Sequence, residues 1–442
     1  MNKAPIAAVV LAAGLGTRMR SETPKHLHPL LGRRLVDWVI EAVRDLGPQP
    51  LVVVTSADQR NAFNGLQVAV QAEPLGTGDA AAAARDALSG FDGDVLVVSG
   101  DAAAITTEIL GRLVETHRGE GAAATVLSFE REKPGDYGRI VRDDDGHLEA
   151  IVEAGDASDE QRALTEVNSS IYVFAASKLW PALERLRPEN TQGELYLTDT
   201  VRELVAEGER VAVFKADDDA EIGVNTRAEL AATADQLRDR INEAHMLAGA
   251  TIVDPKTTWI EPSVELEPDT TIHPFTILRG ETRVARGAEI GPHAVVVDAQ
   301  VGPDALVGPF CYLRPGTVLE ARAKAGAFVE VKNSRLGAGV KAAHQSYIGD
   351  ADIGEGTNIG AGNITANFPH EEGRPKGRTT IGRNVRTGVH NSFVAPVEIG
   401  DDAWIGAGSV ITKDVPPEAL AIARQRQENK EGYVRRKRKQ DG

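Results

Sequence analysis

Hydrophobic residues follow two different periods along the chain. In the first half, apolar runs of strand length at residues 7–13, 51–55 and 95–99 alternate with more polar stretches, and residues 33–46 show helical spacing. This alternation predicts an α/β domain with a largely parallel sheet covered by helices. In sheets of that kind, ligands bind beyond the carboxyl ends of the strands.

The second half has a six-residue period. It begins after residues 227–248, where helical spacing predicts a connecting helix. The series then runs, with slips and interruptions, through Ile260, Leu266, Ile272, Leu278, Val284, Ile290, Val296, Val301, Val307, Leu313, Leu319, Ile348, Ile353, Ile359, Ile381, Thr387, Phe393, Ile399, Ile405 and Ile411. This period is typical of a parallel β-helix, in which aliphatic side chains fill a narrow prism and glycines form its corners. Breaks at residues 322–327 and 368–378 predict loops that project from the coil.

Composition agrees with two or more domains and excludes several classes of protein. The chain has 442 residues, against ~100–200 for one domain. Its 44 glycines and 5% aromatic content indicate a long part without a conventional aromatic core. The start of the chain lacks the features of a signal peptide, and no apolar run approaches the ~18–20 residues of a membrane span, so we expect a cytoplasmic protein. Cys311 is the only cysteine, which excludes an intrachain disulfide and a thiolate metal cluster.

Charge restricts how the protein can handle phosphate. The net charge of −16 argues against general binding of polyanions, so any phosphate must meet local cationic sites. One such site follows the first predicted strand, where residues 11–19 read LAAGLGTRM. Gly14 and Gly16 there would let backbone N–H groups approach phosphates, and Arg18 and Lys25 would add positive charge. A strand-to-helix turn would explain the two glycines alone, but the whole pattern with Pro24 and Lys25 resembles the signature of sugar-1-phosphate nucleotidylyltransferases.

Further matches follow in the order of that family. They are the segments 71–78 (QAEPLGTG), 99–101 (SGD), 137–139 (YGR), 151–153 (IVE), 167–168 (VN) and 223–225 (GVN). With the β-helix, the chain from Leu11 to about Gly432 resembles the family of bifunctional N-acetylglucosamine-1-phosphate uridylyltransferases and glucosamine-1-phosphate acetyltransferases. The resemblance implies binding of the nucleotide by Leu11, Ala12, Ala13, Gly14, Gln71, Gly76, Thr77, Ser99, Gly100 and Asp101. It also implies Mg²⁺ binding by Asp101 and Asn225, sugar contacts by Gly138, Glu153 and Asn168, and catalytic neutralisation of phosphate by Arg18 and Lys25.

A second set of matches lies on the repeat. Arg314, Lys332, Tyr347 and Asn358 resemble the residues that hold glucosamine-1-phosphate in the family's acetyltransferase site, and His344 resembles its general base. An imidazole suits the removal of a proton from the attacking amine. The same resemblance implies acetyl-CoA binding by Ala361, Asn367, Phe368, Val389, Ala407 and Arg424.

The chain departs from the family pattern at four places. Ala102–Ala104 stand where the family usually has Val-Pro-Leu, and Ser169 and Ser170 replace Thr-Gly, so the sugar pocket could differ. Phe368 and Val389 each replace a residue that carries a hydroxyl in the family, which bears on acetyl transfer.

The resemblance implies an α/β Rossmann-like nucleotidyltransferase domain (1–226), a linker helix (227–249), a left-handed parallel β-helix (250–424) and a basic tail (425–442). Residues 424–442 hold eight Lys or Arg and three acidic residues, and we expect a solvated tail or one that covers CoA phosphates, without nucleic acid or membrane partners. The implied function is synthesis of UDP-N-acetylglucosamine for envelope precursors from UTP and acetyl-CoA with Mg²⁺, in a homotrimer. Two alternatives remain: a nucleotidylyltransferase whose β-helix only oligomerises, and a non-catalytic regulator that binds sugar nucleotides.

Overall fold

The computed structural model describes residues 4–14, 16–216, 223–369, 373 and 375–438. Its contacts divide the chain into two compact units, Met1–Leu237 and Arg238–Gly442. The division falls within helix α7 (Arg227–Leu247), where helical spacing predicts the connecting helix. The last four residues of the predicted basic tail lie outside the described part.

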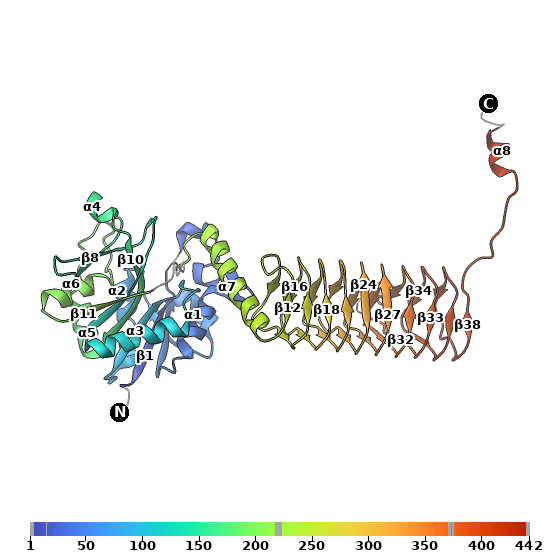
Figure 1. The fold of residues 1–442 in the computed structure, drawn as a ribbon, viewed down its shortest axis with the longest axis horizontal. Coiled ribbons are helices and arrows are strands. Elements are labelled where there is room, and N and C mark those ends of the chain that lie inside the picture. Colours follow the sequence, from blue (N-terminus) through green and yellow to red (C-terminus); the bar gives the residue numbers. More distant parts are fainter. Residues whose placement is uncertain (1–3, 15, 217–222, 370–372, 374, 439–442) are drawn as a thin grey trace. The chain divides into compact units, whose positions relative to one another are not determined.

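The first unit is built on one mixed sheet (Figure 1). Its strands are, in spatial order, β11 (Val211–Lys215), β7 (Ala124–Glu130), β10 (Glu166–Ala175), β6 (Asp94–Ser99), β1 (Ile6–Leu11), β4 (Leu51–Ser56) and β5 (Gln67–Gln71). The strands β6, β1, β4 and β5 run parallel, as the alternating pattern predicts, whereas β10 runs antiparallel to both of its neighbours. The hairpin of β8 (Arg139–Arg142) and β9 (Leu148–Val152) extends from β10, and a small hairpin joins β2 (Pro29–Leu30) to β3 (Arg33–Arg34).

Helices cover both faces of this sheet, because its central strands are apolar on both sides. Along β1, Ala7 and Val9 pack into one buried cluster, and Ala8 and Val10 pack into another. The helices of the unit are α1 (Leu35–Arg44), α2 (Thr77–Ala82), α3 (Thr107–Glu120), α4 (Asp159–Arg162), α5 (Ala176–Arg185), α6 (Asp199–Ala206) and the short 3₁₀ helices η1 (Thr17–Met19), η2 (Lys25–Leu27), η3 (Ala57–Phe63) and η4 (Asp86–Leu88). Among the described residues, no helix is long and apolar enough to cross a membrane.

The second unit is the predicted left-handed parallel β-helix, with three parallel sheets that we name by their first strands. The β12 sheet contains β12 (Thr251–Ile252), β15 (Thr271–Ile272), β18 (Glu289–Ile290), β21 (Leu306–Val307), β24 (Lys324–Ala327), β27 (Lys341–His344), β30 (Asn358–Ile359), β33 (Arg386–Thr387), β36 (Trp404–Ile405) and β38 (Leu420–Ala421). The β13 sheet contains β13 (Trp259–Ile260), β16 (Ile277–Arg279), β19 (Val295–Val297), β22 (Tyr312–Leu313), β25 (Glu330–Lys332), β28 (Tyr347–Gly349), β31 (Ile364–Ala366), β34 (Ser392–Val394) and β37 (Val410–Ile411). The β14 sheet contains β14 (Glu265–Leu266), β17 (Arg283–Val284), β20 (Gln300–Val301), β23 (Val318–Leu319), β26 (Arg335–Leu336), β29 (Ala351–Ile353), β32 (Thr379–Ile381) and β35 (Val397–Ile399). Helix α8 (Tyr433–Arg438) follows in the basic tail.

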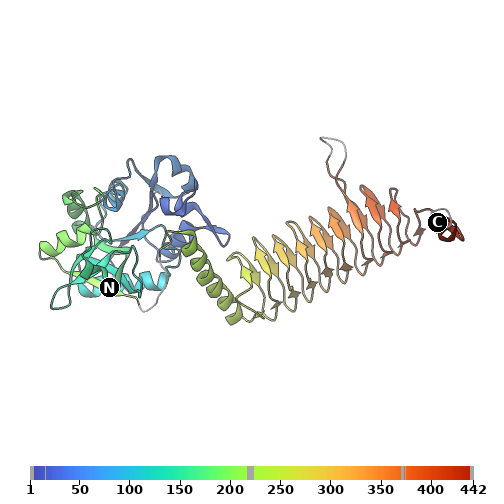
Figure 2. The same cartoon turned by 90° about the horizontal axis from the view of Figure 1, so that it is seen from above.

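Figure 2 shows the strands of successive coils stacked beside one another. The six-residue series visits the three sheets in turn: Ile260 lies in β13, Leu266 in β14 and Ile272 in β15, and Leu278 then returns to the first of these sheets. These side chains form one continuous core, since Ile260, Leu278 and their successors are buried.

One predicted interruption of the coil is wrong. Residues 322–327 form no projecting loop, because β24 pairs in register with β21 and β27, and Ala325 fills the interior position between Val307 and Ala342. The interior series continues with a methyl group where a larger aliphatic side chain was expected. The second break, at residues 368–378, is a connection between β31 and β32, of which residues 370–372 and 374 lie outside the described part.

Candidate functional sites

The strands β1 and β6 end side by side at the carboxyl edge of the first sheet. Leu11 and Ser99 are register partners, and the Gly100 N–H donates to the Leu11 carbonyl at 2.8 Å. A Cβ on Gly100 would lie 2.7 Å from that carbonyl oxygen, so only glycine fits. Ala12 and Ala13 are buried directly beyond β1.

The phosphate loop continues through two glycines with different surroundings. A Cβ on Gly14 would meet no atom within 4 Å, which leaves its backbone open to a ligand. Gly16 has a positive φ of 63°, and a Cβ there would lie 2.4 Å from the Cβ of Lys25. The sequence predicts that the Gly16 backbone lies close to a phosphate, but in the structure it lies close to the aliphatic part of the Lys25 side chain.

Residues far apart in the sequence converge next to this loop. The Lys25 ammonium bonds Asp101 Oδ2 and lies 3.1 Å from Asn225 Oδ1, which also accepts from an Arg18 Nη at 2.8 Å. Asp101 Oδ1 accepts from the Ser99 hydroxyl at 2.6 Å. The second guanidinium nitrogen of Arg18 donates to Asp136 at 2.8 Å, and half of the Arg18 side chain is exposed.

Burial and charge act in opposite directions on Asp101. Burial favours the neutral acid, but the Lys25 ammonium and the Ser99 hydroxyl outweigh it and hold the pKa of Asp101 below its ordinary value. The carboxylate therefore stays ionised at neutral pH, as a ligand for a cation requires.

The predicted sugar residues also lie together. The Asn168 N–H donates to the Gly138 carbonyl at 2.9 Å, and a Cβ on Gly138 would lie 3.4 Å from Glu153 Oε2. Burial raises the pKa of Glu153, and Thr198 donates a hydrogen bond to its carboxyl at 3.2 Å. Tyr137, next to Gly138, reaches toward Asp101, because its hydroxyl donates to the nearby Gly223 carbonyl at 3.3 Å.

The predicted uracil loop is held by its own side chains. Gln71 at the end of β5 donates to the Gly76 carbonyl at 3.0 Å and to Asp79 at 2.9 Å. Gly76 has a φ of 119°, and a Cβ there would lie 2.5 Å from the Leu195 carbonyl oxygen. The Thr77 hydroxyl accepts from the Leu197 N–H at 2.9 Å, so the loop packs on the segment that leads to Thr198.

The oxygens of Asp101 and Asn225 fit a magnesium ion in composition. Both bond the same Lys25 nitrogen, so they lie within reach of one small cation. Mg²⁺ prefers such oxygen ligands, and commonly takes one or two from the protein and the rest from water and substrate phosphates. Within the described ranges, no group of three or more His, Cys, Asp or Glu side chains could hold a metal.

The second unit gathers a cationic group on the β13 sheet. Arg314 and Lys332 lie on adjacent coils, and Arg314 donates to Glu330 at 2.8 Å. Tyr347 follows on the next coil, with its hydroxyl above Gly349. The nearby Lys376 ammonium lowers the pKa of Lys332.

His344 lies at the corner between the β12 and β13 sheets. It directly precedes Gln345, which has a positive φ. On the following coils, the residues with positive φ at this corner are Gly362, His390 and Gly408. The residues directly before them are Ala361, Val389 and Ala407. The N–H groups of Gly362, His390 and Gly408 each donate to the preceding coil at 2.8–2.9 Å, so these residues form one column. We call His344, Ala361, Val389 and Ala407 the corner column. Asn358 lies on the strand next to that of His344, as the register partner of Lys341.

Other residues predicted to bind acetyl-CoA lie elsewhere. Asn367 and Phe368 follow β31, at the opposite edge of the β13 sheet from the corner column. Asn367 bonds Asp350, and the exposed ring of Phe368 lies 5.9 Å from the Lys376 ammonium. Arg424 is at the column's end, where its Cδ would lie 3.7 Å from a Cβ on Gly408.

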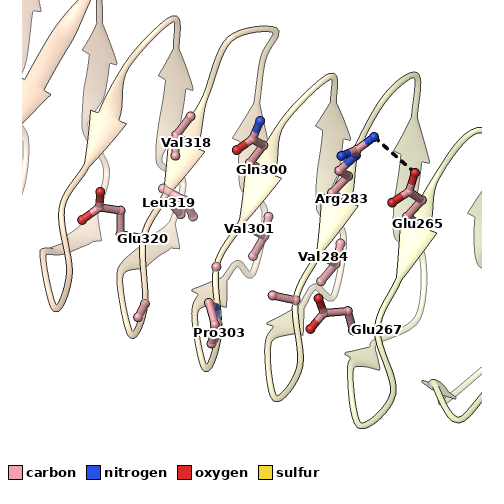
Figure 3. Close-up of a pocket in the computed structure, with 13 residues that line it drawn as sticks. Glu265, Glu267, Arg283, Val284, Gln300, Val301, Pro303, Val318, Leu319 and Glu320 are labelled. Carbon is pink, nitrogen blue, oxygen red and sulfur yellow. Dashed lines mark ion pairs between the residues drawn. The ribbon is translucent and has the colours of Figure 1, made fainter.

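A groove of about 510 Å³ lies on the β14 sheet (Figure 3). The corner column lies between the other two sheets. The charged side chains of the groove hold neighbouring coils together: Arg283 pairs with Glu265 at 3.3 Å, and Glu267 accepts from the Arg286 N–H at 2.8 Å. We therefore assign these residues to the stability of the coil.

Three residues of these sites have no clear sequence signal. Glu229 fixes Asn225 by accepting from its backbone N–H at 2.7 Å, and Asp136 pairs with Arg18. Lys376 lies in the segment that interrupts the repeat, and a lone lysine between glycines and prolines carries no periodic pattern. Only the break in the repeat at residues 368–378 indicates that this segment could carry a functional residue.

Comparisons with known proteins match both units of the chain. A family model for the MobA-like NTP transferase domain matches residues 8–211. Relatives named bifunctional protein GlmU from Streptomyces avermitilis and Streptomyces coelicolor are each 47% identical over 460 residues, which cover 98% of this chain and 95% of each relative. The protein of that name from Mycolicibacterium gilvum is 45% identical, with 98% of this chain and 92% of the relative covered.

Proposed function

This chain belongs to the family of bifunctional GlmU proteins, and we propose that it makes UDP-N-acetylglucosamine in two reactions, one in each unit. The first acetylates glucosamine-1-phosphate from acetyl-CoA. The second transfers uridylyl from UTP to N-acetylglucosamine-1-phosphate and releases pyrophosphate. The convergence of Arg18, Lys25, Asp101 and Asn225 at the carboxyl edge of the first sheet carries the proposal.

In uridylyl transfer, one phosphate must attack another. The sugar phosphate approaches the α-phosphorus of UTP, a bond to pyrophosphate breaks, and the two anions repel one another. Arg18 and Lys25 offset that repulsion, while Gly138, Glu153 and Asn168 hold the sugar. A Mg²⁺ ion held by Asp101 and Asn225 would stabilise charge on the phosphates. No protein nucleophile is required.

In acetyl transfer, the amine of glucosamine-1-phosphate attacks the thioester carbon, and the CoA thiolate leaves. His344 accepts the proton of the attacking amine. Arg314, Lys332 and Lys376 hold the sugar phosphate, with Tyr347 and Asn358 beside the sugar. The small residues of the corner column let the pantetheine arm approach the backbone, and Arg424 meets a CoA phosphate.

We propose a homotrimer formed along the corner between the β12 and β13 sheets. Phe275, His293, Phe310 and Phe328 stack there with ring centroids 4.7, 4.7 and 5.2 Å apart, and we call them the aromatic ladder. All four have positive φ, a costly conformation for bulky residues, and the three phenylalanines are about half exposed or more. At the other corners of the β-helix, the residues with positive φ are mainly Asp, Asn and Gly. A second copy of the chain would cover the aromatic ladder.

The proposed domain boundaries are 1–226, 227–249, 250–424 and 425–442, supported by the division of contacts within α7. We also propose that the protein acts in the cytoplasm, supported by its use of UTP and acetyl-CoA.

The test is to assay each reaction separately on the purified chain. We expect UDP-N-acetylglucosamine from UTP, N-acetylglucosamine-1-phosphate and Mg²⁺, and free thiol from acetyl-CoA and glucosamine-1-phosphate. Uridylyl transfer without thiol release would select the alternative in which the β-helix only oligomerises. Absence of both products would reject the proposal.

A further inference from the structure

The Lys25 ammonium lies between Asp101 and Asn225, the two residues that would hold a divalent cation. It bonds Asp101 Oδ2 and is 3.1 Å from Asn225 Oδ1. The same oxygen of Asn225 accepts from Arg18 at 2.8 Å, and the other oxygen of Asp101 accepts from Ser99 at 2.6 Å. Each oxygen that would bind a metal is therefore already engaged, and the cationic partners are side chains of this protein.

A metal ion and the Lys25 ammonium cannot share this place at low cost. The Lys25 and Asp101 side chains are 17% and 15% exposed, so water screens charges here only weakly. A divalent cation in contact with Asp101 would meet the Lys25 charge at short range. Binding of the metal thus requires Lys25 to leave, and the buried ammonium then needs another anion.

The stem of Lys25 limits where the ammonium can go. Its Cβ packs against Gly16 of the phosphate loop, so close that a Cβ on Gly16 would lie 2.4 Å away. Beyond the Cβ, the side chain is a flexible chain of three carbons with a compact charge at its end. When the ammonium moves away from Asp101, it stays beside the loop whose open Gly14 backbone would meet phosphate. Nucleotide phosphates are therefore the anion that can receive it.

We propose that Lys25 is the resident cation of Asp101 and Asn225, and that it is exchanged for the divalent metal only when nucleotide phosphates arrive. The inference rests on the proposed uridylyl site and adds an order of events to it. The free protein binds divalent metal weakly, and metal and nucleotide strengthen one another's binding. That coupling is reciprocal, because both ligands favour the state in which Lys25 has left Asp101.

The test measures metal affinity without nucleotide. Mn²⁺ is titrated into the full-length protein, and free Mn²⁺ is followed by electron paramagnetic resonance. We expect Lys25→Met to bind Mn²⁺ at least about tenfold more tightly than the wild type, because it removes the charge that lies on Asp101, whereas the Arg18 contact with Asn225 is the same in both proteins. Lys25→Arg keeps the charge and should bind as weakly as the wild type. Arg20→Met is the matched control, since it removes an exposed cation from the same loop, and should also leave the affinity unchanged.

Two further measurements test whether the change in Mn²⁺ affinity comes from this site and do not depend on how well a single variant folds. Adding Asp101→Asn to Lys25→Met should abolish the gain. In the wild type alone, millimolar Mg²⁺ should leave the melting temperature unchanged, whereas Mg²⁺ with UTP should raise it. An unchanged Mn²⁺ affinity in a folded Lys25→Met variant, or a rise with Mg²⁺ alone in the wild type, would overturn the exchange. These results would leave the proposed function intact as long as the wild type makes UDP-N-acetylglucosamine. A wild type without uridylyl transfer would contradict the proposed function itself.

Discussion

His26 follows Lys25 and is buried in a position where a charge would be costly. Its ring stacks on Phe63 with centroids 6.0 Å apart, and its Nε2 has no hydrogen-bond partner in the described part of the chain. Burial lowers the pKa of His26 to about 4 from 6.5. The imidazole is therefore neutral at physiological pH, and adds no charge beside Lys25.

This burial predicts a specific loss of stability in acid. Between pH 6.5 and 4 the unfolded chain binds the His26 proton and the folded chain does not, so stability falls as pH falls through this window. From pH 7 to pH 5, the wild type should lose about 2 kcal/mol more free energy of unfolding than His26→Leu. Urea unfolding at the two pH values measures this. The exposed His147→Leu should behave like the wild type, and equal losses in wild type and His26→Leu would contradict the account.

Single residues also show how far the sequence predicts the site. The family motifs identify Arg18, Lys25, Asp101 and Asn225, and the structure brings their side chains together. Lys376 could not be predicted, since its place beside Lys332 depends on the path of an irregular connection. The proposed exchange of Lys25 for a metal ion at Asp101 could not be predicted from the sequence either, because it depends on side-chain contacts.

At the scale of elements, the packing of α2 depends on a glycine. Gly76 precedes α2 with a φ of 119°, and a Cβ would lie 2.5 Å from the Leu195 carbonyl oxygen. We expect Gly76→Ala to cost about 1–3 kcal/mol and to weaken UTP binding. Gly119, inside α3, is the control: a Cβ there meets nothing within 4 Å, so Gly119→Ala should stabilise by about 0.5–1 kcal/mol. Thermal unfolding and UTP titration measure both; a Gly76→Ala protein as stable as the wild type would contradict this reading.

The elements of the two units differ in how well the sequence predicts them. In the β-helix, every coil repeats the same environment, so the hydrophobic period predicts most interior positions, but the series between Leu319 and Ile348 misses the buried Ala325, Val331, Leu336 and Ala342. The error at residues 322–327 arose because Ala325 is too small to register as a core residue, although the prism accepts it. In the first sheet, the reversed direction of β10 depends on connections between distant strands, which the local pattern does not contain.

At the scale of the whole molecule, the aromatic ladder predicts self-association. Phe310→Asp with Phe328→Asp would place two charges where a second copy covers apolar rings, so the trimer should dissociate. Sedimentation should then report 47.1 kDa, where the wild type reports three times that mass. Val318→Asp, on the charged β14 sheet, is the control and should remain a trimer. A wild-type protein that sediments as a stable monomer would contradict the proposal.

The central claim is that one chain holds two separate sites linked by a diffusible product. Asp101→Ala disables uridylyl transfer, and His344→Ala removes the base for acetyl transfer, where such groups contribute about 10²–10⁴-fold. The most direct measurement supplies glucosamine-1-phosphate, acetyl-CoA, UTP and Mg²⁺, and follows UDP-N-acetylglucosamine. Each variant alone should make almost none, and the mixture should restore synthesis, since Asp101→Ala supplies the acetylated sugar phosphate that His344→Ala consumes. Loss of both partial reactions in either single variant, or a mixture that stays inactive, would contradict the account.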